Sequence, residues 1–273
     1  MADLFSVEDK VIVITGAGGV LCGEIAEDLG RRGANIAVLD IDKEKAETVA
    51  ANIRKEGGEA FAVEANVLDK ESLEKAKDTV ISCYQRVDVL FNGAGGNKPE
   101  ATADPEKMPF FDIPEDAVQF VFNLNIVGTI LTSQVFGKVM AEQKYGTIVN
   151  VSSMNSYRPL TKIVAYSAAK ASVNNFTQWL AVHMNQNYST DIRVNAIAPG
   201  FFLTEQNRFL LLDEQTGEPT QRGQQIVDHT PMGRYGKPED VFGTVTWLIS
   251  DAAAFVNGII VPIDGGFSAY SGV

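Results

Sequence analysis

The sequence predicts an α/β fold: a doubly wound, mostly parallel sheet with helices on both faces. Short β-branched apolar runs alternate with helix-length amphipathic segments along the whole chain. A glycine-rich turn separates the first apolar run from the first helical pattern. No repeat or Pro/Gly/Ser-rich linker divides the 273 residues, so we expect a single domain over residues 1–273.

Composition narrows the classes of function. A hydrophobic fraction of 45% is enough for a large core, and 35 acidic against 23 basic residues give a net charge of −12, which disfavours nucleic acid as a partner. No segment has the roughly 20 uninterrupted apolar residues of a membrane span, and the first ten residues lack an apolar run. Cys22 and Cys83 stand alone, and His183 is far from His229. We expect a cytoplasmic protein without a membrane partner or a metal site.

The first elements form one strand, helix and strand unit. Lys10–Thr15 is a β-branched run, the turn Gly16–Gly19 follows, and Ile25, Ala26 and Leu29 recur at helical spacing. A second apolar run ends at Asp40. Later strands are expected at Ala60–Val63, Val87–Phe91, Thr147–Val151, Ile192–Ala198 and Gly258–Val261.

Two longer segments interrupt this alternation. Residues 97–115 contain four prolines without a clear period, and residues 205–230 are polar with short apolar interludes. Both follow strands, and ligands bind beyond the carboxyl ends of strands in open α/β sheets. We therefore expect substrate loops near 97–115 and 205–230, the alternative being simple surface excursions.

The glycine turn and Asp40 together favour a dinucleotide. Glycines at Gly16–Gly19 let the backbone approach a pyrophosphate that faces the helix amides, although a tight turn without a ligand has the same pattern. Asp40 ends the second strand, where a carboxylate accepts hydrogen bonds from the adenosine ribose and repels a 2′-phosphate. Neither Arg nor Lys stands at positions 17–19, 41 or 42, so we expect NAD rather than NADP. Alternatively, Asp40 or Asp42 caps the helix that begins near Lys43.

A second constellation combines a phenol, an ammonium and a hydroxyl. Tyr166 and Lys170 are spaced i, i+4 in a helical segment that extends to about Gln186, so they share one helix face. The ammonium would favour the phenolate and let the tyrosine exchange a proton with an alcohol or carbonyl. Ser152 and Ser153 end a strand at the expected ligand edge. The alternative is an ordinary pair on a solvated helix face.

In combination these motifs resemble the short-chain dehydrogenase/reductase family from about Lys10 to Phe267. The matches stand in order at Thr15-Gly16, Asn92-Gly93-Ala94-Gly95, Asn125, Ser153, Tyr166 with Lys170, Pro199-Gly200 with Thr204, and Asp264-Gly265-Gly266. The resemblance implies a Rossmann-type fold, a homotetramer, and catalysis by Ser153, Tyr166 and Lys170 with support from Asn125. Lys170 would lower the tyrosine pKa and hold the nicotinamide ribose. The implied cofactor contacts are Gly16, Gly18, Gly19, Val20, Leu21, Asp40, Asn66, Val67, Asn92, Gly93, Ala94, Tyr166, Lys170, Pro199, Gly200, Phe202 and Thr204.

The chain departs from the family pattern at the cofactor turn. Val20 and Cys22 stand where the second and third glycines usually occur, and we expect their side chains to crowd the turn and change its path. Gly93 replaces a usual asparagine, and Asn66 replaces a usual acidic residue.

A narrower resemblance connects the chain to the sugar-acid branch of the family, the D-mannonate oxidoreductases, which interconvert D-mannonate and D-fructuronate. It rests on Gly18–Cys22, Gly95–Asn97 and Pro199–Arg208. Expected carboxylate partners are Lys98, Arg158 and Arg208, and the expected hydroxyl-reading residues are Asn97, Asn155 and Gln206. Polyol or gluconate dehydrogenases are the alternatives within the family, and a dinucleotide-sensing binding protein without catalysis is the alternative outside the enzymes.

Overall fold

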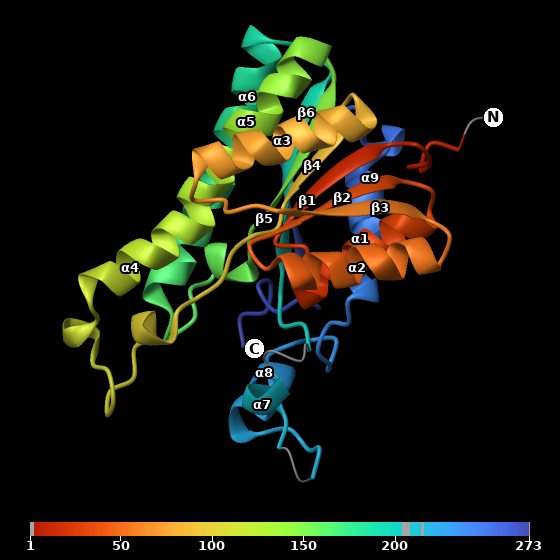
Figure 1. The fold of residues 1–273 in the computed structure, drawn as a ribbon. Coiled ribbons are helices and arrows are strands. Elements are labelled where there is room, and N and C mark those ends of the chain that lie inside the picture. The colour runs from red at the N-terminus through yellow and green to blue at the C-terminus, as the bar shows by residue number, and fades with distance from the viewer. Residues whose placement is uncertain (1–2, 204–207, 214–215, 273) are drawn as a thin grey trace.

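The computed structural model describes residues 3–203, 208–213 and 216–272, apart from the side chains of Phe209 and Leu210. Its centre is one parallel sheet of order β3-β2-β1-β4-β5-β6-β7 (Figure 1). The strands are β1 Val11–Thr15, β2 Asn35–Asp40, β3 Glu59–Glu64, β4 Val89–Asn92, β5 Gly146–Val151, β6 Ile192–Pro199 and β7 Ile260–Ile263. The expected doubly wound fold is confirmed, with the last strand beginning two residues later than predicted. The order reverses between β1 and β4, which opens a crevice at their carboxyl ends.

Helices cover both faces of the sheet. They are α1 Val20–Arg31, α2 Lys43–Lys55, α3 Lys70–Tyr84, α4 Glu115–Phe122, α5 Gly128–Gln143, α6 Val164–Asn187, α7 Arg208–Leu211, α8 Gln221–Asp228 and α9 Glu239–Ile249. Strand alternation divides the core: Ile12 and Ile14 of β1 pack with α1, α2 and α9, whereas Val11 and Val13 pack with α3, α5 and α6. This separation explains why the strands are apolar on both faces.

One continuous helical run joins α4 to α5. A five-residue π-helical segment, Asn123–Val127, connects the two helices. The run Glu115–Gln143 is long and apolar enough to cross a membrane by length and composition, and half of its most apolar window is buried inside the protein. Because α5 packs against β4, β5 and α3, this apolar character is that of a core helix.

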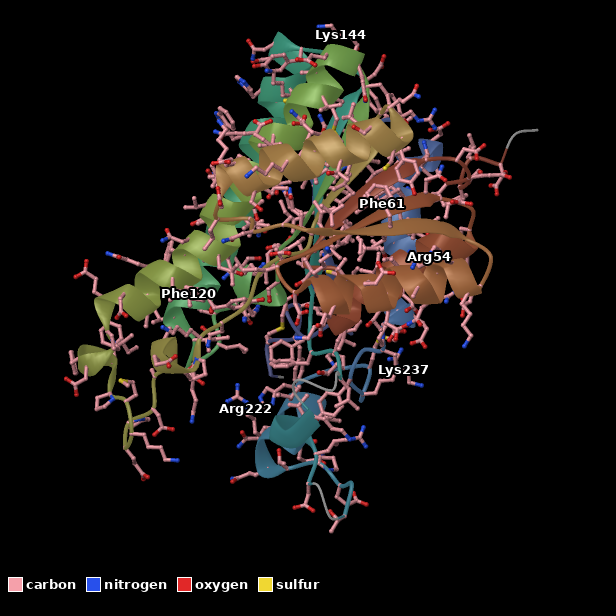
Figure 2. The ribbon with its side chains drawn as sticks, in the orientation of Figure 1. Arg54, Phe61, Phe120, Lys144, Arg222 and Lys237 are labelled. Carbon is pink, nitrogen blue, oxygen red and sulfur yellow. The ribbon has the colours of Figure 1, made fainter. Side chains whose placement is uncertain are left out.

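Two lobes extend from the carboxyl edge of the sheet (Figure 1). The first, residues 97–122, follows β4 and contains 3₁₀ turns at Pro99–Ala101 and Phe110–Asp112 before α4. The second, the described part of residues 201–238, follows β6 and contains α7 and α8. Figure 2 shows Phe120 on the first lobe and Arg222 on the second. The second predicted loop is therefore partly helical, because Thr220 caps α8 and the Ile226 side chain of α8 is buried.

Candidate active site

The first turn of α1, which follows the glycine-rich turn after β1, has no side chain bonded to its backbone amides in the described chain. Gly19 is the N-cap of α1 and, within the described chain, no side chain caps this helix end. Gly16 has a φ of +66°, and a Cβ atom there would lie 2.7 Å from the Cα of Ala94. The turn can thus lie against the segment after β4 only with glycine. Uncapped amides at a helix N-terminus suit a pyrophosphate.

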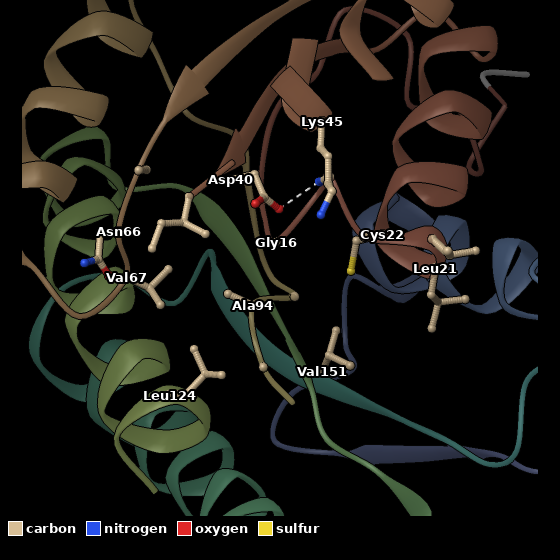
Figure 3. Close-up of a pocket in the computed structure, with 17 residues that line it drawn as sticks. Gly16, Leu21, Cys22, Asp40, Lys45, Asn66, Val67, Ala94, Leu124 and Val151 are labelled. Carbon is tan, nitrogen blue, oxygen red and sulfur yellow. Dashed lines mark hydrogen bonds between the residues drawn. The ribbon is translucent and has the colours of Figure 1, made fainter. Parts of the chain in front are cut away.

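A cleft of about 400 Å³ opens beside this turn (Figure 3). It lies where the strand order reverses, as expected for a nucleotide site in such a sheet. Ten predicted cofactor residues line it: Gly16, Gly18, Gly19, Val20, Leu21, Asp40, Asn66, Val67, Gly93 and Ala94. The sequence analysis missed Cys22, Ile41, Lys45, Ala65, Gly95, Leu124 and Val151 as lining residues. Most of them are neighbours in sequence of predicted residues, but Lys45 is the third residue of α2.

Asp40 presents its carboxylate at one end of this cleft. Its Oδ2 accepts the backbone N–H of Gly18 at 2.9 Å, and its Oδ1 accepts that of Asp42 at 2.9 Å. Asp42, rather than Asp40, caps α2 by accepting the N–H groups of Glu44 and Lys45. The helix-capping alternative therefore applies to Asp42, and Asp40 is held toward the cleft.

The expected crowding of the turn is wrong because two departures from the family pattern compensate one another. The Sγ of Cys22 occupies the space that a Cβ atom at Gly93 would need. A Cβ atom on Gly23, one residue later, would lie 3.2 Å from both Ala17 O and Val49 Cγ2 of α2. Val20 begins α1 and lines the cleft without blocking it. A thiol in α1 is thus matched by a missing side chain after β4.

Tyr166 and Lys170 share one face of α6 beside the far end of the cleft. The Lys170 Nζ lies 5.6 Å from the centroid of the Tyr166 ring and donates a hydrogen bond of 2.7 Å to the carbonyl of Val151. Val151 lines the cleft. Lys170 is buried, and the helix begins at Val164, two residues before Tyr166. The ammonium is therefore fixed between the proposed cofactor cleft and the phenol.

Burial dominates the titration of both groups. It lowers the pKa of Lys170 from 10.5 to about 8. It raises the pKa of Tyr166, and a hydrogen bond between the Ser153 and Tyr166 side chains opposes that rise. The expected lowering of the Tyr166 pKa by the lysine is wrong, because burial is the largest influence on this group. Tyr166 is thus a neutral phenol near pH 7, ready to donate a proton.

Asn125 joins the segment after β4 to α4. Its Nδ2 donates to Gly96 O at 2.7 Å and to Val121 O at 2.8 Å, and its Oδ1 accepts the N–H of Gly96 at 3.1 Å. A Cβ atom on Gly95 would lie 2.7 Å from Asn125 Oδ1 and 3.1 Å from Lys170 Nζ. Asn125 lies on the π-helical segment, a distortion frequent at functional sites. Its side chain therefore positions backbone next to the lysine.

Several predicted cofactor contacts lie elsewhere. The Asn92 side chain donates to Ser133 and Asn150 inside the core, which corrects the expectation that it faces the cofactor. Gly200 packs against Asp264, and the Phe202 ring packs over Gly236. Pro199 ends β6 and is buried. None of these four lines the cleft within the described residues, and Thr204 lies outside them.

The predicted substrate residues are dispersed around the carboxyl edge. Asn97 is exposed and donates to Thr102. Exposed Arg158 donates through Nε to Ser268 O at 2.6 Å, and exposed Arg208 begins α7. Asn155 stands two residues after Ser153 and is buried, and its Oδ1 has no hydrogen-bond partner among the described residues. Gln206 lies outside the described residues.

Comparison with known proteins agrees with this geometry. A family model described as enoyl-(acyl carrier protein) reductase matches residues 19–268, and the doubly wound parallel sheet is the one expected above. The chain belongs to the short-chain dehydrogenase/reductase family. This family comprises NAD(P)-dependent dehydrogenases and reductases of alcohol and ketone groups, so the chain is an oxidoreductase and the sensing protein without catalysis is set aside.

Three members of this dehydrogenase/reductase family show the range of its near relatives. An uncharacterized oxidoreductase UxuB of Bacillus subtilis is 50% identical, covering 97% of this chain and 96% of its own. A candidate D-mannonate oxidoreductase from Haemophilus influenzae, solved with bound NAD, is 47% identical with a TM-score of 0.92 over 98% of both chains. A gluconate 5-dehydrogenase from Burkholderia cenocepacia, solved with NADP and tartrate, is 28% identical with a TM-score of 0.86 over 98% of both chains.

Metal-ligating side chains do not gather in the described parts of this enzyme. No group of three or more His, Cys, Asp or Glu side chains there is arranged to hold a metal ion. The polar groups beside the cleft are instead a phenol, a hydroxyl, an amide and an ammonium.

Proposed function

We propose that the protein transfers a hydride between NAD and a secondary alcohol or ketone of a sugar acid, with D-mannonate and D-fructuronate as the preferred pair. The observation that carries the proposal is the continuity of the cleft, which runs from the Asp40 carboxylate to Val151, the residue that holds the Lys170 ammonium. One end suits an adenosine ribose, and the other adjoins a phenol that can exchange a proton.

The cleft fits a dinucleotide. The uncapped amides of α1 would hold the pyrophosphate, Asp40 would accept the ribose hydroxyls, and Lys170 would donate to the nicotinamide ribose. When bound, NAD supplies or accepts the hydride at its nicotinamide ring. The NAD bound to the Haemophilus relative and the carboxylate at position 40 both support NAD as the preferred cofactor.

The proton transfer is assigned to the residues beside that end of the cleft. During reduction, the neutral Tyr166 phenol donates its proton to the carbonyl oxygen as negative charge develops there. Ser153 donates a hydrogen bond to the same oxygen. Lys170 stabilises the phenolate that results. Asn125 holds the neighbouring backbone in place while Tyr166 takes up a new proton. During oxidation the same groups act in the opposite direction.

A sugar acid is the substrate class that the polar groups support. Asn155 offers a buried oxygen acceptor next to Ser153 that a substrate hydroxyl would satisfy. The Nε of Arg158 is anchored to Ser268 O. The two terminal nitrogens of the same guanidinium would bind a substrate carboxylate. The Haemophilus relative, a candidate D-mannonate oxidoreductase, supports this class.

We also propose that the protein is a homotetramer, which rests on the family resemblance, and that it is cytoplasmic, which rests on the sequence features given above. Size-exclusion chromatography with light scattering would measure the assembly directly.

A substrate panel tests the function. The purified protein is incubated with D-mannonate, D-gluconate and a neutral polyol of the same length, each with NAD, and NADH is followed by absorbance. We expect the highest kcat/KM with D-mannonate. A preference for D-gluconate or for the polyol would reassign the substrate within the family. No turnover of any secondary alcohol, despite measured NAD binding, would overturn the assignment of the catalytic groups.

A further inference from the structure

Asn174 extends the row of polar side chains that α6 presents to the end of β5. It follows Tyr166 and Lys170 at intervals of four residues, so the three side chains lie along one face of the helix. Lys170 holds the Val151 carbonyl, and the next residue, Ser152, donates its hydroxyl to Asn174 Oδ1 at 2.5 Å. The first two members of the row have a place in the proposed reaction, whereas Asn174 has none so far.

The Asn174 amide joins two serines that flank Ser153. Its Oδ1 accepts the hydroxyl of Ser152, which lies farther, at 3.3 Å, from its other acceptor, Lys170 O. Its Nδ2 donates to Ser156 Oγ at 2.8 Å. The Ser156 hydroxyl in turn donates to the Ser153 carbonyl at 2.6 Å, and the Ser156 N–H donates to the same oxygen at 2.9 Å. The bonds therefore run in one direction, from the Ser152 hydroxyl through the amide to the Ser153 carbonyl.

This chain of bonds requires an amide at position 174. The side chain must accept a hydrogen bond from Ser152 and donate one to Ser156. An amide does both, whereas a carboxylate only accepts and an apolar side chain does neither. Ser152 is 1% exposed and Asn174 is half-buried, so water does not easily replace a lost partner. The amide is therefore specific to these contacts.

The turn that Asn174 holds carries groups of the proposed reaction. Ser153 caps the 3₁₀ turn Met154–Ser156, and its hydroxyl accepts the Asn155 N–H at 3.3 Å and is hydrogen-bonded to the Tyr166 side chain. Holding both the residue before Ser153 and the Ser153 carbonyl fixes the peptide units on either side of its Cα atom. The direction of its hydroxyl follows, and a displacement of about 1 Å at a reacting group can cost about 10²-fold in rate.

We propose that Asn174 is a positioning residue: through the two serines that it bonds, its amide sets the Ser153 hydroxyl against Tyr166. This inference rests on the proposed function. Asn174 does not line the cofactor cleft in the described part of the chain. Its substitution should therefore slow the chemical step and leave cofactor binding unchanged.

A double-mutant cycle separates positioning from a general structural role. We measure kcat for D-fructuronate reduction, in single turnovers where it is slow, and NADH affinity by fluorescence for Asn174→Leu, Ser153→Ala and the double variant. Asn187→Leu is the matched control, because it is an exposed asparagine at the far end of the same helix. Ser156→Ala removes only the link from the amide to the Ser153 carbonyl. It is tested with and without Ser153→Ala, and it carries the test if Asn174→Leu does not fold.

We expect Asn174→Leu to lower kcat about tenfold in the wild type but less than about twofold in Ser153→Ala, because residues that act as a unit are not additive. Ser156→Ala should show the same dependence with a smaller loss. NADH affinity should stay within about twofold throughout, and Asn187→Leu should change neither quantity. An equal fall in kcat with and without the Ser153 hydroxyl, or a parallel loss of NADH affinity, would overturn the proposal. Absence of turnover in the wild type, despite NADH binding, would instead count against the proposed function.

Discussion

The cofactor cleft and the two lobes beside it are built from different kinds of contact. In the cleft, backbone groups set the shape: the Thr15 hydroxyl accepts the N–H groups of Gly93 and Ala94, and Asp40 accepts that of Gly18. On the lobes, the groups expected to recognise substrate are mostly exposed side chains, such as Asn97 and Arg208. The first region depends on strand ends and glycines, and the second depends on side-chain placement.

This contrast separates what reaction the protein performs from what substrate it uses. A backbone cradle at a strand crossover accommodates the same cofactor in many proteins, because it reads groups common to every dinucleotide. Substrate selection needs polar groups placed for one molecule, and a misplaced group costs affinity. Substitutions in the two regions should therefore alter different kinetic constants.

The largest effect should come from Tyr166, where the two regions meet. Tyr166→Phe removes the proton donor and keeps the ring that packs against Ala165 and Val121. We expect kcat to fall by about 10²–10⁴-fold while NADH affinity changes less than threefold, since an acid/base contributes about that factor. Steady-state kinetics with D-fructuronate and NADH titration by fluorescence measure the two quantities.

Tyr157→Phe is the matched control for this substitution. The Tyr157 hydroxyl donates to Ile260 O and faces β7, away from the hydride-transfer end of the cleft. It should retain turnover within a few-fold of the wild type. Comparable losses in both variants would remove Tyr166 from its role as the acid.

Substitutions at Cys22 and Gly93 test whether backbone packing sets the shape of the cofactor cleft. Gly93→Ala places a methyl group against the Cys22 Sγ and 2.6 Å from Thr15 O, so we expect about 1–3 kcal/mol of destabilisation and weaker NADH binding. Cys22→Ala/Gly93→Ala should regain part of both, because only the thiol conflict is relieved. Urea unfolding and NADH titration check this. If the second change restores neither, the two residues do not compensate one another.

Periodicity and spacing predicted most of this architecture. Strand positions, the α6 face that carries Tyr166 and Lys170, and the Asp40 end of the cleft all follow from local pattern, because each depends on residues close in sequence. The partnership of Cys22 with Gly93 could not be predicted in this way, since the two residues meet only after β4 lies beside β1. Taken alone, each residue was only a departure from the usual sequence pattern of the family.

Lys45 and Tyr166 show a second reason for error. A search for cations directly after Asp40 missed Lys45, because the helix brings its third residue back over the turn. The pKa of Tyr166 was expected to fall because spacing placed an ammonium nearby, but spacing does not show how far both groups are buried.

Burial of the Lys170 ammonium should destabilise the folded protein. Its pKa is lowered from 10.5 to about 8, so the unfolded chain binds this proton more tightly than the folded protein does. The penalty is therefore complete below about pH 8 and disappears as the pH rises through about 10.5. Lys170→Met should be more stable than the wild type by about 1–2 kcal/mol at pH 7, after loss of the bond to Val151 O is offset.

Thermal melts from pH 7 to pH 10 of Lys170→Met, the wild type and Lys43→Met check this sign. The difference between Lys170→Met and the wild type should shrink as the pH rises, and Lys43→Met serves as the control for removing an exposed lysine. A difference that stays constant across that range would show that the buried charge is not the cause.

Arg158 gives the smallest predicted effect and the sharpest test of the substrate side. Its guanidinium is exposed and anchored to Ser268 O, so water already competes for any carboxylate it binds. Arg158→Ala should raise KM for D-mannonate about fivefold to tenfold, roughly 1 kcal/mol, with little change in kcat or in the KM for a neutral polyol. Arg31→Ala, at the opposite end of α1 from the cleft, should change neither KM. An equal rise for both substrates would mean that Arg158 supports the C-terminal turn through Ser268 rather than the substrate carboxylate, and recognition of the acid would then belong to another cation on the lobes.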